Sequence, residues 1–314
     1  MPLDPQAEAL LAQMAATPVW YSIPLAEARQ QRVISAPIMN GTPEPVEHVE
    51  DRAIPGPRGE IPVRIYTPES NGPFGVLIYF HGGGWVLSNL ETHDALCRKL
   101  ANRAACIVVS VDYRLAPEHK FPSAVEDAYA ATCWVAEHIG ELNGDPTRIA
   151  IGGDSAGGNL ATIVTHIAHD QGSPPLLYQV LIYPVTDFYT PDSLTHSYHT
   201  YSEGYFLTRE GMEHFWEHYL NTPEEGADPR VAPLRRSDLS GLPPALIITA
   251  EFDPLLDEGE LYAARLEEAG VPMTLRRYDG MIHGFFTMSA VLDKSRQAID
   301  ETAQTLRPVF AKVQ

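Results

Sequence analysis

The stretch Ile149-Ala150-Ile151-Gly152-Gly153-Asp154-Ser155-Ala156-Gly157-Gly158-Asn159 decides the fold. An apolar run typical of a buried strand passes through small residues directly into a helical segment. Within the junction, Gly153-x-Ser155-x-Gly157 has the pattern of a nucleophile elbow, a tight turn that lifts a serine hydroxyl clear of a sheet. A chain of this length contains the pattern by chance with a probability of about 8 %, so the strand-then-helix context is what makes it a prediction.

Short apolar runs recur on both sides of this junction, with amphipathic stretches between them. The expected strands are Val46–Ile54, Ile61–Tyr66, Val76–Phe80, Cys106–Val111, Ile149–Gly152, Leu177–Tyr183, Ala245–Ala250 and Met273–Tyr278. The expected helices are Thr92–Ala104, Ser123–His138, Gly157–Asp170 and Leu256–Glu268, with a last one near Ser289–Ala311. Apolar strands separated by helices predict an α/β fold with a mostly parallel, doubly wound sheet covered on both faces.

Two segments fall outside this alternation. The first begins with a helical pattern over Pro5–Ala16, after which Pro18, Pro24 and Pro37 are expected to break the chain into short pieces. The second, residues 187–230, has no clear strand and is rich in aromatic and histidine residues. Insertions after a strand's carboxyl end lie over the ligand crevice of such sheets. We therefore predict a core of residues 46–186 and 231–314 with a helical cap of residues 1–45 and 187–230.

A glycine-rich loop directly follows the expected strand Val76–Phe80. Its sequence, His81-Gly82-Gly83-Gly84, leaves backbone N–H groups free to point at a ligand. Such a loop supplies oxyanion-hole donors together with the N–H of the residue after the nucleophile, so Gly83, Gly84 and Ala156 are the candidate donors. The Lys and Ser/Thr of a phosphate-binding P-loop do not follow these glycines.

A serine hydroxyl needs a base to take its proton and an acid to orient that base. After such an elbow the acid precedes the histidine in chain order. Asp253 follows the expected strand Ala245–Ala250, and His283 follows the expected strand Met273–Tyr278. Both lie where parallel strands end, so we predict Asp253 as the acid and His283 as the base, with Glu251 or Asp257 as alternative acids.

Taken together, these motifs resemble the hormone-sensitive-lipase family of bacterial esterases, also called family IV. The matching segments are His81-Gly82-Gly83-Gly84, Tyr113-Arg114-Leu115-Ala116-Pro117-Glu118, Gly153-Asp154-Ser155-Ala156-Gly157-Gly158-Asn159, Asp253-Pro254-Leu255 and His283-Gly284-Phe285. The resemblance implies an α/β-hydrolase fold and a carboxylesterase that acts on short- to medium-chain acyl esters, without metal or other cofactor. It also implies that residues 113–118 brace the glycine loop and that His81 orients this loop rather than acting as a base.

Composition limits the partners and the location. The 314 residues include 22 Lys and Arg against 41 Asp and Glu, a formal net charge of −19 that disfavours nucleic acid. No apolar run approaches the ~18 residues that span a bilayer, and the first basic residue, Arg29, comes too late for a signal peptide. Cys97, Cys106 and Cys133 are expected as buried free thiols. We expect a cytoplasmic protein with a small-molecule ester substrate, and a homodimer stays open.

Two functions other than an esterase agree with parts of the sequence. His214-Phe215-Trp216-Glu217-His218 fits the inverted zinc-peptidase pattern, and its spacing puts His214 and His218 on one helical face. No third zinc ligand is indicated, so a zinc peptidase is the alternative and an aromatic cap helix the favoured interpretation. A non-catalytic ligand-binding protein on the same scaffold would need a lost nucleophile or base, but Ser155, Asp253 and His283 are all present.

Overall fold

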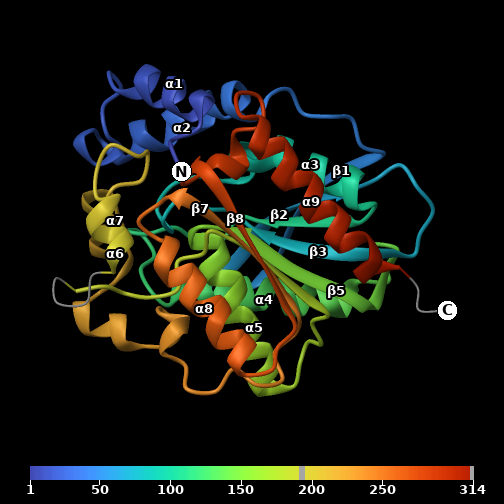
Figure 1. The fold of residues 1–314 in the computed structure, drawn as a ribbon. Helices are drawn as coiled ribbons and strands as arrows, with labels where there is room; N and C mark the ends of the chain where they lie inside the picture. Colours follow the sequence, from blue (N-terminus) through green and yellow to red (C-terminus); the bar gives the residue numbers. More distant parts are fainter. Residues whose placement is uncertain (191–194, 312–314) are drawn as a thin grey trace.

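The centre of the molecule is an eight-stranded sheet with the order β1-β2-β4-β3-β5-β6-β7-β8 (Figure 1). The computed structural model describes residues 1–190 and 195–311. The first strand pairs antiparallel with the second, which pairs antiparallel with the fourth, and every other neighbouring pair is parallel. The strands are β1 His48–Gly56, β2 Gly59–Thr67, β3 Phe74–Phe80, β4 Ile107–Val111, β5 Gly144–Asp154, β6 Tyr178–Ile182, β7 Ala245–Phe252 and β8 Met273–Ile282.

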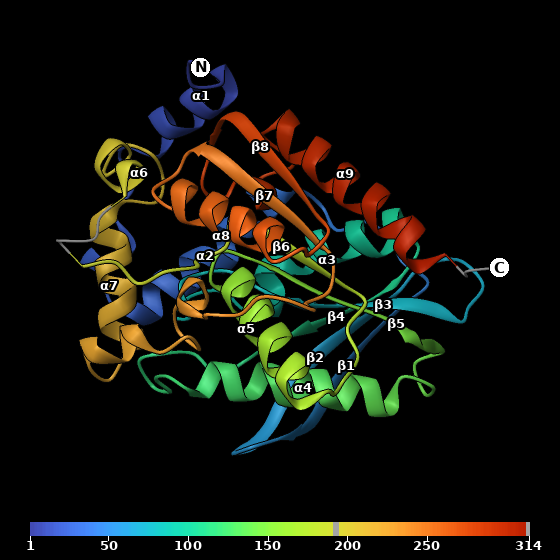
Figure 2. The same cartoon turned by 60° about the horizontal axis from the view of Figure 1, so that its bottom comes forward.

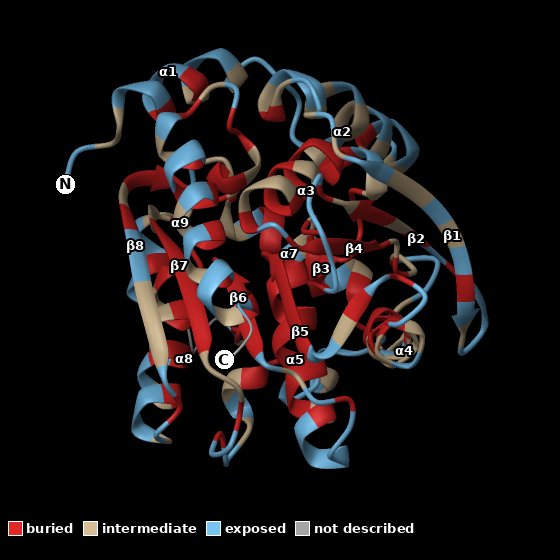
Figure 3. Ribbon diagram, turned by 90° about the vertical axis from the view of Figure 1, so that its right-hand side faces the viewer, coloured by how far each residue is buried: buried red, intermediate tan, exposed pale blue. Residues whose placement is uncertain are grey.

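Helices cover both faces of this sheet. Helices α3 (Leu90–Ala104) and α9 (Asp293–Phe310) lie on one face, and α4 (Ser123–His138), α5 (Ala156–Gln171) and α8 (Leu256–Glu268) on the other (Figures 1 and 2). The side chains of β3 alternate between two apolar clusters, one on each face of the sheet. Val76 and Ile78 belong to the apolar cluster under α4, α5 and α8, whereas Leu77 and Tyr79 belong to the cluster under α3 and α9. Figure 3 shows the inner strands as a buried layer between these helices.

The predicted fold class, a mostly parallel doubly wound α/β sheet, is confirmed. The bounds differ most at β5, which begins at Gly144, and at β8, which continues to Ile282 instead of ending at Tyr278. The extension of β8 has a structural cause, because its pairing with β7 shifts register between Ala250 and Phe252 and resumes at Ile282. The irregularity brings the residue before His283 back into the sheet.

The N-terminal segment differs from the expectation of short pieces. Helix α1 (Pro5–Met14) and a 3₁₀ turn (Trp20–Ser22) are followed by α2, an uninterrupted helix of 16 residues over Leu25–Asn40. Pro24 lies at the N-cap of α2, where a missing N–H costs no helical hydrogen bond. Pro18 and Pro24 lie between these pieces, as expected, but Pro37 lies inside α2, so the prediction that Pro37 breaks the segment is wrong.

The described residues of 187–230 contain helices and no strand, as expected. They form α6 (His196–Thr200), α7 (Arg209–Tyr219) and a 3₁₀ helix (Pro223–Ala227), and two further 3₁₀ helices lie at Pro233–Arg235 and Phe285–Thr287. Helices α1, α2, α6 and α7 lie at the same end of the sheet, where β7 and β8 run to their carboxyl ends (Figures 1 and 2). Two segments far apart in the sequence therefore meet at the edge that carries the predicted site.

All three cysteines are free, and Cys97 and Cys106 are buried, but Cys133 is partly exposed rather than buried. None of the helices in residues 1–190 and 195–311 is long and apolar enough to cross a membrane.

Asn159, in the first turn of α5, ties the two ends of the 187–230 segment to the core. Its buried side-chain amide donates to the carbonyl oxygen of Val185 and to that of Val231, each over 2.9 Å. These residues lie just before and just after the inserted segment. Both carbonyls would lose their partner without this amide, and buried unsatisfied acceptors are costly.

Replacing Asn159 should therefore destabilise the protein. We expect Asn159→Ala to lower the free energy of unfolding in urea by about 2 kcal/mol. Asn159→Asp keeps the side-chain shape but removes both donors, so it should cost at least as much. Thr162→Ala, one turn further along, removes only a hydroxyl bond to the Gly158 carbonyl and is the matched control. A fully stable Asn159→Asp protein would contradict this role of the amide.

Candidate active site

Ser155 lies in a strained turn between β5 and α5. Its backbone has φ 57° and ψ −119°, a combination that costs an L-residue on the order of 1–3 kcal/mol. The turn also requires glycine at two flanking positions. A Cβ at Gly157 would overlap the carbonyl oxygen of Phe80, and one at Gly153 would lie 2.5 Å from the same oxygen. The elbow pattern in the sequence thus corresponds to an elbow whose glycines touch the end of β3.

Ser155, His283 and Asp253 form a continuous chain of hydrogen bonds. The Ser155 hydroxyl oxygen is 2.9 Å from Nε2 of His283, and Nδ1 of His283 is 2.6 Å from Oδ2 of Asp253. All three side chains are buried, and Oδ1 of Asp253 accepts a further hydrogen bond from the Leu255 N–H. With Nδ1–H donating to Asp253, Nε2 is free to accept the serine proton. The structure therefore brings together the three residues predicted as nucleophile, base and acid.

The alternative acids are engaged elsewhere. Oε2 of Glu251 accepts a hydrogen bond from the Gly280 N–H over 2.6 Å. Oδ2 of Asp257 accepts one from the Ser197 N–H over 2.7 Å. Neither carboxylate forms a hydrogen bond with His283 in the described part of the chain, so the geometry favours Asp253.

The three predicted oxyanion donors lie on the two loops that meet at the elbow. Gly83 (φ 109°) and Gly84 (φ 62°) follow β3, and Ala156 is the first residue of α5. The N–H groups of Gly83 and Gly84 donate to no other described residue. Position 84 has no room for a side chain, because a Cβ on Gly84 would overlap the Phe215 ring of α7. Unpaired amides next to a buried serine suit the binding of an oxyanion.

Asp154 connects the elbow to the glycine loop. Its Oδ1 accepts hydrogen bonds from the Gly82 N–H (3.1 Å), the Tyr79 hydroxyl (2.9 Å) and Nε2 of His93 (3.1 Å). Burial by itself would raise the pKa of Asp154. The positive charge of His93, together with hydrogen bonds from His93 and Tyr79, outweighs burial and lowers this pKa. Burial lowers the pKa of His93. Sequence reasoning did not identify Tyr79 or His93; the only signal was a histidine near the start of the amphipathic helix α3.

A second set of contacts braces the glycine loop from residues 113–118. The Tyr113 hydroxyl donates to the His81 carbonyl over 2.7 Å, and the two rings stack at 4.4 Å. The Ala116 N–H donates to the Trp85 carbonyl. Arg29 of α2 donates to the carbonyls of Val86 and Ala116. His81 is fully buried, its Nδ1 lies 2.8 Å from the Gly82 carbonyl, and it forms no hydrogen bond with Ser155.

The two histidines of the zinc-peptidase pattern are held by other contacts. His214 stacks on Tyr21 with ring centroids 4.4 Å apart, and its Nδ1 lies 3.3 Å from Glu217. Nδ1 of His218 is 2.7 Å from the backbone carbonyl of His214. Residues 1–190 and 195–311 contain no cluster of three or more His, Cys, Asp or Glu that could hold a metal ion. The pattern is part of an aromatic helix, α7.

Comparison with known proteins agrees with this geometry. A family model described as the alpha/beta hydrolase fold matches residues 77–287. A carboxylic ester hydrolase of Mycobacterium tuberculosis, LipN, is 45 % identical over 88 % of this chain and 75 % of its own length. An arylesterase of Saccharolobus solfataricus is 40 % identical over 85 % of each chain.

Solved structures are equally similar. An esterase of Pyrobaculum calidifontis has 44 % sequence identity and a TM-score of 0.91, over 98 % of this chain and 99 % of its own. An alpha/beta hydrolase from the metagenome of Lake Arreo has 40 % identity and a TM-score of 0.93, over 98 % of each chain. The chain belongs to the α/β-hydrolase fold family, within the group of carboxylesterases related to hormone-sensitive lipase.

Proposed function

We propose that this chain hydrolyses carboxylic esters through an acyl-enzyme intermediate on Ser155. The observation that carries the proposal is the buried chain of hydrogen bonds from Asp253 through His283 to Ser155. Its similarity to a carboxylic ester hydrolase and to an arylesterase supports the same reaction. A small-molecule ester is thus the substrate class.

The reaction has two halves, and His283 moves a proton in each. Ser155 Oγ bonds to the ester carbonyl carbon while Nε2 of His283 takes the hydroxyl proton. The bond to the alcohol oxygen then breaks, and His283 gives the proton to that leaving oxygen. Water next attacks the acyl-Ser155 carbonyl with His283 again as base, the acid departs, and the proton returns to Ser155. Asp253 keeps Nδ1 protonated and stabilises the imidazolium at both stages.

The N–H groups of Gly83, Gly84 and Ala156 are assigned to the oxyanion that forms on the carbonyl oxygen. One such donor contributes roughly 3–4 kcal/mol to transition-state stabilisation. Asp154 positions the glycine loop for this task, because its carboxylate holds the Gly82 N–H next to the elbow.

We assign residues 1–45 and the described part of 187–230 to a cap over this site and the remaining residues to the hydrolase core. The support is in three contacts. Phe215 of α7 packs against Gly84, Trp20 stacks on Phe215 at 4.4 Å, and Phe206 packs against Gly284 beside His283. Apolar walls of this kind suit acyl esters of short to medium length. The cytoplasmic location stays a prediction, and the oligomeric state stays open.

Ser155→Ala should abolish ester hydrolysis while the protein stays folded. We expect kcat for para-nitrophenyl esters, assayed from acetate to decanoate, to fall on the order of 10⁴ to 10⁶ because no nucleophile is left. Ser70→Ala, at an exposed position, is the control and should keep full activity. Substantial turnover by Ser155→Ala would overturn the assignment of the nucleophile.

Asp253→Asn should keep the geometry but favour the wrong His283 tautomer. We expect kcat to fall on the order of 10⁴. Asp257→Asn tests the alternative acid and should have a small effect, since Asp257 accepts only from Ser197 in the described contacts. If the two variants exchange these effects, Asp257 rather than Asp253 is the acid.

The activity should also depend on pH. A protonated imidazole cannot accept the Ser155 proton, so kcat/KM should fall as the solution becomes acidic. Initial rates across the acid and neutral range measure this at constant ionic strength. A profile that stays flat down to about pH 4 would contradict a histidine base.

A further inference from the structure

Arg32, in the middle of α2, carries a partly buried positive charge with no hydrogen-bond or ion-pair partner in the described structure. Within residues 1–190 and 195–311, its guanidinium makes no hydrogen bond and no ion pair. Every other described arginine that is not exposed has at least one acceptor. Arg29, one turn earlier on the same helix, binds the Glu118 carboxylate through two nitrogens at 2.8 Å each. The contrast sets Arg32 apart from the structural arginines.

The Phe206 ring contacts both the guanidinium of Arg32 and the residue after His283. The central carbon of the guanidinium is 5.7 Å from the centroid of the Phe206 ring. Phe206 packs against the residue after His283, since a Cβ at Gly284 would come within 2.8 Å of Phe206 Cε1. The Tyr183 ring packs against His283, with centroids 4.5 Å apart, and its buried hydroxyl has no acceptor in the described structure. Two kinds of donor therefore lie near the base without an acceptor of their own.

Among the residues that the structure describes, no carboxylate forms an ion pair with Arg32. Burial lowers the pKa of the guanidinium, and the negative charge of Asp154 offsets part of this shift. Asp154 is nevertheless not in ion-pair contact with Arg32, and its Oδ1 already accepts three hydrogen bonds. A desolvated cation with five N–H donors is best satisfied by an anion, and a carboxylate matches its planar fork with two parallel hydrogen bonds.

The side of the substrate that Arg32 faces follows from the proposed reaction. His283 returns its proton to the leaving alcohol, so groups beside His283 lie next to the alcohol part of the ester. We propose that Arg32 binds a carboxylate on the alcohol part of the substrate, which makes esters of hydroxycarboxylic acids a preferred substrate class. This inference rests on the proposed esterase function and adds a specificity determinant to it.

A matched pair of acetate esters tests the proposal. At neutral pH meta-acetoxybenzoate is an anion and meta-acetoxybenzamide is neutral, while acyl group, ring and size are the same. The measured quantity is the ratio of kcat/KM for the anionic ester to kcat/KM for the neutral one, at constant ionic strength. Using a ratio removes the general repulsion of anions by a chain with net charge −19 from the comparison between variants.

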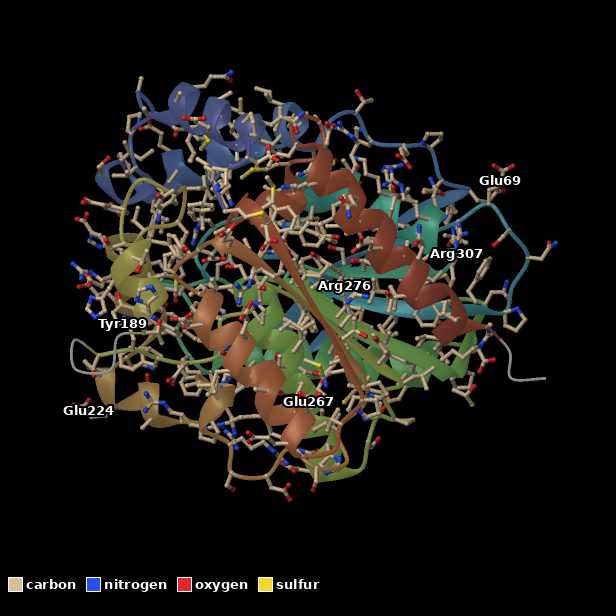
Figure 4. The ribbon with its side chains drawn as sticks, viewed as in Figure 1. Glu69, Tyr189, Glu224, Glu267, Arg276 and Arg307 are labelled. Carbon is tan, nitrogen blue, oxygen red and sulfur yellow. The ribbon has the colours of Figure 1, made fainter. Side chains whose placement is uncertain are left out.

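We expect Arg32→Gln to lower this ratio about tenfold or more, mainly through KM of the anionic ester. Arg32→Lys should retain part of the preference, because it keeps the charge but loses the fork. Arg276→Gln is the control for net charge. Arg276 is exposed on β8 (Figure 4), and among the described residues its guanidinium bonds only to the neighbouring Leu275 carbonyl, so this variant should keep the wild-type ratio and activity.

Other results would overturn the proposal. An unchanged ratio in Arg32→Gln would show that Arg32 does not bind the carboxylate. An equal loss on both esters would assign Arg32 to the positioning of Asp154 instead. If the wild-type protein hydrolyses neither ester nor any nitrophenyl ester, the proposed function itself fails; the Arg32 site is then judged by whether meta-hydroxybenzoate binds to it more tightly than meta-hydroxybenzamide in calorimetry.

Discussion

The close contact between Gly157 and the carbonyl oxygen of Phe80 is the constraint on which the site depends. No side chain fits between these atoms, so the start of α5 lies directly against the end of β3. The contact places the strained Ser155 turn beside the glycine loop, which continues from the same strand. Parallel pairing of β5 with β3 on one side and β6 on the other holds the strain. Nucleophile and oxyanion donors are thus adjacent because two strands are neighbours in the sheet.

The buried carboxylates have different roles, and each role depends on the hydrogen-bond donors around the carboxylate. Asp253 faces a histidine and shapes its tautomer, and Asp154 faces amide, hydroxyl and imidazole donors and holds two loops together. Glu258, at the start of α8, is buried as well and accepts from the Thr186 N–H. Burial raises the pKa of Glu258 well above its usual range. In a chain with 41 acidic residues, the surroundings rather than the residue type separate these three from the solvated majority.

The N-terminal helices contribute cations to a site built by the sheet. Arg29 is fully paired and braces the loop after β3 through backbone carbonyls and Glu118. Arg32 approaches from the same helix and stays unpaired. Trp20 stacks on Phe215 and so joins the N-terminal segment to α7, and Phe206 packs against Gly284 beside His283. The catalytic residues therefore follow strands of the sheet, whereas the proposed selectivity comes from helix α2.

The sequence by itself determined the sheet class, most element bounds, and the candidate residues Ser155, Asp253 and His283. These follow from patterns between neighbours along the chain: an apolar run, a glycine beside a turn, a polar residue after a strand. It could not show that α2 runs through Pro37, because a proline removes one i→i−4 hydrogen bond and usually ends a helix, but here it does not. Nor could it find the contacts of His93 and Arg32. Those depend on which elements the strand order and the cap bring together, and only the tertiary structure decides distances between residues far apart in the chain.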